Sequence, residues 1–157
     1  MSATTSLLTA CSGFLFAVLW MDLMFDAQVL ADRHPGGELP ESVLDSIARY
    51  YRRAVTGSRP MSHLIAVVMV VLLGALGFRA VRGHDPVWLV AVSIVLAGAP
   101  ILLAATHTVP NAVRLGGRSG SPAAQTALAL SIWRDHLACA VCISAFLVLW
   151  VVHDAVF

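Results

Sequence analysis

Four long apolar runs constrain this chain more than any other feature of its sequence. They are Leu7–Leu30, Met61–Phe78, Pro86–Ala105 and Leu137–Phe157. A helix that crosses the ~30 Å hydrocarbon core of a bilayer needs about 20 mostly apolar residues, and the four runs approach or exceed that length. Charged residues make up 12% of the chain, which is about half their share in a soluble domain. The sequence therefore predicts an all-α protein, a four-helix transmembrane bundle that forms one integral membrane domain.

Turn and helix-start residues between the runs set the expected helix bounds. We expect spans at residues 5–30, 61–79, 86–108 and 123–153, with Pro110 bending or ending the third. Pro40 and Glu41 suit the first turn of a short helix over residues 41–56. Apolar residues follow at helical spacing, among them Leu44 and Ile47. The pattern indicates an amphipathic helix that either lies in the membrane interface or packs on the end of the bundle.

The arginines indicate an orientation in the membrane. All ten basic residues are arginine, and eight of them flank the first and third connections between spans. The positive-inside rule then places these connections in the cytoplasm and both termini outside, in a plasma (inner) membrane. Lipid is the expected partner, and a homo-oligomer or a larger membrane complex stays open. The net charge of +1 gives no reason to expect a nucleic-acid partner.

Polar residues gather at the predicted cytoplasmic ends of all four spans, and the opposite ends carry few. They are Asp22, Asp26, His63, His107, Asn111, Trp133, Arg134, Asp135 and His136. Placing a carboxylate in hydrocarbon costs several kcal/mol of free energy unless a partner forms hydrogen bonds or an ion pair with it. We therefore expect Asp22 to be buried and paired with Arg134, whose guanidinium can form two parallel hydrogen bonds to a carboxylate. Asp26, His63 and His136 have the simpler alternative of lying solvated at the headgroup level.

Two short segments carry a family resemblance. Thr108–Leu115, which contains Pro110-Asn111, and Ile132–His136, which contains Trp133, are similar to segments of the anthrone-oxygenase-like family of small four-helix membrane proteins. The resemblance implies oxidation of a flat polyketide anthrone to an anthraquinone by dioxygen, without an evident cofactor.

The same resemblance suggests roles for the polar residues. His107 or His136 would be the base that removes a proton. Asn111 and Arg134 would stabilise the enolate-like oxygen, and Trp133 would stack on the substrate. The remaining candidate substrate-binding residues are Asp22, Asp26 and His63.

Several alternatives stay open. Cys139 and Cys142 form a C-x-x-C pair that resembles the one in vitamin K epoxide reductase and would make the protein a thiol–quinone oxidoreductase. The first loop has no cysteine and both thiols have apolar neighbours, so a packing role is favoured. The aspartates and histidines could also bind a transition metal, although we expect no cofactor. Finally, the chain could be a non-catalytic subunit or scaffold. An enzyme needs a cavity beside Asn111 and Trp133, whereas a scaffold would have that region packed shut.

Overall fold

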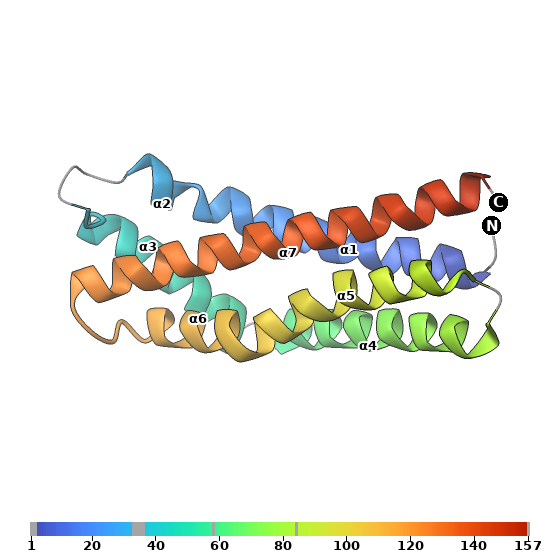
Figure 1. Ribbon diagram of the computed structural model, residues 1–157. Coiled ribbons are helices and arrows are strands. Elements are labelled where there is room, and N and C mark those ends of the chain that lie inside the picture. The colour runs from blue at the N-terminus through green and yellow to red at the C-terminus, as the bar shows by residue number, and fades with distance from the viewer. Residues whose placement is uncertain (1–2, 33–36, 58, 84, 157) are drawn as a thin grey trace.

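The described part of the chain is built of helices and contains no strand. The computed structural model describes residues 3–32, 37–57, 59–83 and 85–156. Its elements are α1 (Ala3–Asp26), α2 (Gln28–Ala31), α3 (Glu41–Tyr51), the π-helix η1 (Arg52–Gly57), α4 (Arg59–Arg82), α5 (Val87–Leu103), the π-helix η2 (Ala104–Thr108), α6 (Val109–Gly116) and α7 (Pro122–Val156). Figure 1 shows the long helices running side by side in an elongated bundle. The predicted all-α class is confirmed.

Four helical stretches are long and apolar enough to cross a membrane. They are Ala3–Ala31, Pro60–Arg82, Val87–Gly116 and Pro122–Val156. Large apolar side chains point outward along them, and Val70, Val95 and Val148 are 70%, 64% and 59% exposed. Such a surface suits lipid contact. The four predicted spans are confirmed, and the chain is a small integral membrane protein. The predicted orientation, with both termini outside, stays a prediction.

The bundle has two distinct ends. The two termini, the end of α4 and the start of α5 lie at one end, called here the terminal end (Figure 1). Helices α2, α3 and α6 and the start of α7 lie at the other, called here the α3 end. The polar residues that the sequence analysis placed at the cytoplasmic ends of the spans lie at the α3 end or where it meets the spans.

Helix α3 packs on the end of the bundle. Its apolar side chains recur on one face, and Leu44, Ile47 and Tyr51 are buried. They share a core with Leu115 of α6 and Ile132 of α7. Of the two placements that the sequence allowed for this amphipathic helix, the structure shows the one against protein. A separate core between α1, α4, α5 and α7 holds the rest of the bundle together.

The third span continues past the point where the sequence predicted its end. Pro110 has no N–H, and its ring crowds the carbonyl group four residues earlier, which belongs to Thr106. The chain accommodates this by widening into the π-helix η2 and then resuming as α6. Single π-helical turns inside α-helices often mark functional sites, and η2 carries His107.

A close backbone contact fixes α6 against the end of α3. The Nε atom of Arg52 donates a hydrogen bond to the carbonyl oxygen of Gly116 at 3.1 Å. A Cβ atom at position 116 would lie 3.1 Å from the backbone nitrogen of Arg52. Glycine therefore permits an approach that a larger residue would widen.

Candidate functional site

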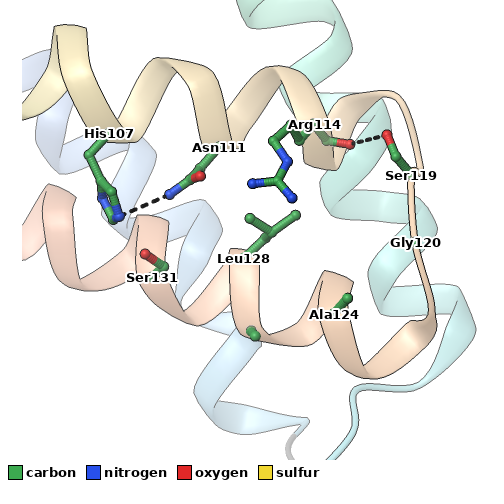
Figure 2. Close-up of a pocket in the computed structure, with 9 residues that line it drawn as sticks. His107, Asn111, Arg114, Ser119, Gly120, Ala124, Leu128 and Ser131 are labelled. Carbon is green, nitrogen blue, oxygen red and sulfur yellow. Dashed lines mark hydrogen bonds between the residues drawn. The ribbon is translucent and has the colours of Figure 1, made fainter.

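A pocket opens between α6 and α7 at the α3 end of the bundle (Figure 2). Its volume is about 470 Å³, which is within the usual range for small-molecule sites. It is lined by His107, Asn111, Arg114, Ser119, Gly120, Ala124, Ala127, Leu128 and Ser131. The lining residues of η2 and α6 recur every three or four positions, as do those of α7, so two helix faces form the walls.

His107 is held in one orientation by Asp135. Its Nδ1 atom lies 2.7 Å from Oδ2 of Asp135, and the hydroxyl group of Thr108 donates to the same oxygen at 2.9 Å. A carboxylate only accepts hydrogen bonds, so Nδ1 carries the ring proton and donates it to Asp135. The Nε2 atom then keeps its lone pair and accepts from the side-chain amide of Asn111 at 3.3 Å (Figure 2).

This arrangement suits a general base. The His107 side chain is 49% exposed, whereas that of Asp135 is 11% exposed. A buried carboxylate orients an accessible imidazole, and its far nitrogen can take a proton from a bound molecule that displaces the long 3.3 Å hydrogen bond from Asn111. Of the candidate residues from the sequence, His107 and Asn111 meet at this pocket.

A second group of polar side chains lies on another side of α7. Asp26 accepts hydrogen bonds from the hydroxyl of Tyr51 at 2.6 Å and from Nδ1 of His136 at 2.8 Å. Asp22, one turn earlier on α1, accepts from the hydroxyl of Tyr50 at 2.5 Å. We call these five residues the buried cluster. Burial, together with the adjacent aspartates, raises the pKa of Tyr50 and of Tyr51 above the usual value. Both hydroxyls therefore stay protonated and donate.

The expected pair between Asp22 and Arg134 is not formed. Tyr50 is the partner of Asp22, and Arg134 has an exposed side chain on α7. The more buried of the two aspartates is Asp26, whose side chain is 1% exposed and therefore not solvated, whereas Asp22 is only partly buried. The physical reason is that α3 folds back over the end of α1 and covers Asp26 with its tyrosines.

The other candidate residues lie away from the pocket. His136 is buried against Asp26, on a different side of α7 from His107. Trp133 is partly exposed, and His63 is exposed near the start of α4. These residues and Arg134 are not among those that line the pocket. The cavity that an enzyme would need beside Asn111 and Trp133 is present only in part, because the pocket is lined by Asn111 but does not extend to Trp133.

Five residues of the two sites were missed as candidates in the sequence. They are Tyr50, Tyr51, Thr108, Arg114 and Asp135. Asp135 belonged to the polar group at the start of the fourth span, but nothing in the sequence showed that it faces His107. The tyrosines occupy the α3 segment that was read as an apolar stripe, and only the proximity of two aspartates reveals their use as donors.

The terminal end of the bundle, where the sequence has few polar residues, also holds a polar group. The Nε atom of Arg79 donates to Asp85 at 2.7 Å, and its Nη1 atom donates to the hydroxyl of Thr5 at 2.6 Å. The same guanidinium lies 4.6 Å from the centre of the Trp150 ring. Arg79, the last residue of the predicted second span, lies in the last turn of α4 and turns inward, where Asp85 is its partner.

The cysteines and the metal alternative find no further support. Cys139 is buried and its Sγ atom lies 3.8 Å from the carbonyl oxygen of Pro100, while Cys142 is partly exposed, and both thiols are free. Within residues 3–32, 37–57, 59–83 and 85–156, no three histidine, cysteine, aspartate or glutamate side chains come together as a metal site would require.

Comparison with known protein families, with curated proteins and with solved structures found no match to this chain. The resemblance to the anthrone-oxygenase-like family therefore stays a prediction.

Proposed function

We propose that the protein is a membrane enzyme that oxidises a flat, apolar compound with dioxygen, as the resemblance to the anthrone-oxygenase-like family implies. The observation that carries the proposal is the His107 imidazole, which reaches the pocket while its other nitrogen is fixed on a buried carboxylate. A histidine base that a carboxylate holds in this way is suited to removing a proton from carbon. The apolar side chains of Ala124, Ala127 and Leu128 suit a flat hydrocarbon surface on the opposite wall.

In the proposed reaction, Nε2 of His107 removes one proton from a methylene group that a conjugated carbonyl activates. The electron pair moves into the ring system and onto the carbonyl oxygen, where the amide of Asn111 can donate a hydrogen bond. The electron-rich carbon then bonds to dioxygen, and the peroxide takes up a proton and loses water to form a second carbonyl. One substrate and one dioxygen thus give one quinone and one water. Asp135 keeps the imidazole in the required tautomer throughout.

The pocket also bears on the alternative of a non-catalytic scaffold. A scaffold would have this region filled by side chains, whereas α6 and α7 pack through Leu115 and Ile132 and leave a pocket beside that contact. In the buried cluster, in contrast, Asp26, Tyr51 and His136 are buried and hydrogen-bonded to one another, as in a packing element. We therefore assign the chemistry to the His107 side of α7 and the structural role to the His136 side.

The proposal can be tested with anthrone as the probe and the protein reconstituted in lipid nanodiscs. Deuterium uptake at the methylene group in heavy water under argon reports proton removal alone, and dioxygen consumption in air reports the whole reaction. We expect His107→Gln to slow both rates by about 10²-fold or more, which is the usual contribution of a general base. Asp135→Asn should slow both rates as well.

The matched control is His153→Gln, which removes a histidine at the terminal end of the bundle and should leave both rates unchanged. The proposal fails if the wild-type protein exchanges deuterium no faster than empty nanodiscs do. It fails equally if His107→Gln exchanges at the wild-type rate while circular dichroism shows an intact fold.

A further inference from the structure

Arg114 is a charged residue of the pocket that the proposed chemistry does not use. Figure 2 shows its guanidinium between α6 and α7, beside Leu128. The Arg114 side chain is exposed, and no carboxylate lies within ion-pair distance of it in the described part of the chain. The nearby acidic residues of α3, Glu41 and Asp45, are paired with Arg118 instead.

The backbone beneath this guanidinium is well fixed. The hydroxyl of Ser119 donates to the carbonyl oxygen of Arg114 at 3.2 Å, across the start of the loop that leads to α7. Gln125 holds the same loop by donating to the carbonyl oxygen of Gly120 at 2.9 Å and by accepting from Arg118. The loop therefore closes one end of the pocket, and Arg114 lies at that end.

The polar residues of the pocket follow one another along a single helix face. His107, Asn111 and Arg114 are separated by four and then three positions, so they share a face. Seven residues at 1.5 Å per residue place Arg114 about 10 Å from His107 along the axis. A molecule that lies along the pocket would therefore meet the base His107, the amide of Asn111 and the cation Arg114 in that order.

We propose that the compound bound in this pocket carries an acidic group, a carboxylate or an ionised phenol, which Arg114 binds at the end remote from the reacting carbon. This inference rests on the proposed function for the position of the reacting carbon, although binding of the acid does not depend on turnover. A guanidinium donates two parallel hydrogen bonds to a carboxylate, and this geometry selects an anion over a neutral ester of similar shape. The substrate class is therefore a flat aromatic acid.

The inference can be tested by binding alone. An anthraquinone carboxylate and its methyl ester are equilibrated by dialysis with the protein in nanodiscs of uncharged phosphatidylcholine. Arg114→Gln should weaken binding of the acid by about tenfold, as expected for a lost charge-assisted hydrogen bond, and should leave the ester unaffected. Comparing variants with one ligand at a time removes the difference in how acid and ester partition into lipid.

Two further variants make the result specific. Arg114→Lys, which keeps the charge but not the planar fork, should recover part of the affinity for the acid. Arg82→Gln removes an exposed arginine at the terminal end and should leave both affinities unchanged. The inference is overturned if Arg114→Gln binds the acid as tightly as the wild type does. It is also overturned if native mass spectrometry shows that Arg114 retains an anionic phospholipid and the wild type binds acid and ester alike.

The outcomes separate the two proposals. In the His107→Gln background, deuterium exchange is lost, but adding Arg114→Gln should still weaken binding of the acid by about tenfold, because the guanidinium acts independently of the base. Loss of exchange without any effect of Arg114→Gln on binding would leave the proposed function and remove the inference about the acid. The reverse result, an Arg114-dependent preference for the acid in a protein without exchange, would leave a binding site and remove the enzyme.

Discussion

The buried cluster makes a sharp prediction about two aspartates on the same helix. Asp26→Ala should destabilise the protein far more than Asp22→Ala, although the residues are one turn apart and each accepts from a tyrosine hydroxyl. Asp26 has two partners, Tyr51 and His136, and its side chain is 1% exposed. Asp22 has a single side-chain hydrogen bond and is only partly buried.

The expected magnitudes follow from these contacts. Removing Asp26 leaves a buried hydroxyl and a buried imidazole N–H without their acceptor, and each buried donor left unsatisfied costs about 1–3 kcal/mol. Removing Asp22 deletes a single hydrogen bond of a partly buried carboxylate, for which about 1 kcal/mol is expected. Both changes shorten an aspartate to alanine in a helix, so the backbone contribution is similar and cancels in the comparison.

The assay is equilibrium unfolding of the purified protein in mixed micelles, with increasing denaturing detergent and helicity as the readout. We expect the Asp26→Ala midpoint to fall well below that of Asp22→Ala. Equal losses for the two single variants would refute the reasoning, because the difference rests on the burial and the second partner of Asp26. A cost of 1 kcal/mol or less for Asp26→Ala would refute it as well.

Three further predictions concern other parts of the molecule. Tyr50 and Tyr51 are the chain's two tyrosines, and their raised folded-state pKa values mean that stability is intact below the unfolded value of about 10 and falls as the pH rises above it. Ultraviolet titration should therefore show no phenolate near pH 10 while the helices persist, and ordinary titration of the folded protein would contradict this. Gly116→Ala should cost about 1–3 kcal/mol because its new Cβ would lie 3.1 Å from a backbone nitrogen of η1, whereas Gly74→Ala, which meets nothing within 4 Å, should be neutral or stabilising in the same unfolding assay; equal effects would count against the close contact. Arg79→Met should lower stability by about 1–3 kcal/mol because the buried carboxylate of Asp85 loses its hydrogen bonds from the guanidinium, and an unchanged unfolding midpoint would show that the ion pair contributes nothing.

The overall fold could be predicted because it depends on length and periodicity. Apolar runs of span length indicate membrane helices in any arrangement, and the spacing of Leu44 and Ile47 indicates an amphipathic helix wherever it packs. The i,i+4 spacing of His107 and Asn111 likewise placed both on one helix face before any tertiary contact was considered.

The rotation of each helix could not be predicted, and the contents of the site depend on it. Arg134, Asp135 and His136 are consecutive, and each residue turns the helix by about 100°. Their order in the sequence does not say which of them faces α6, which faces α1 and which faces outward. A membrane span that is apolar on all sides offers no hydrophobic face to decide the question. The wrong prediction of a pair between Asp22 and Arg134 arose because this rotation was unknown.

Asp135 and His136 together fix the rotation of α7 about its own axis. Asp135 bonds to His107 and Thr108 on one flank, and His136 bonds to Asp26 on another. Lipid tails and apolar side chains are chemically alike, so an apolar helix in a bilayer gains little free energy from any particular rotation about its own axis. Two neighbouring polar residues with partners in different directions remove that freedom, since a turn that preserved one bond would break the other. Because a helix is rigid, the rotation fixed at these two adjacent positions also determines which side chains face the bundle core farther along α7, as far as Trp150.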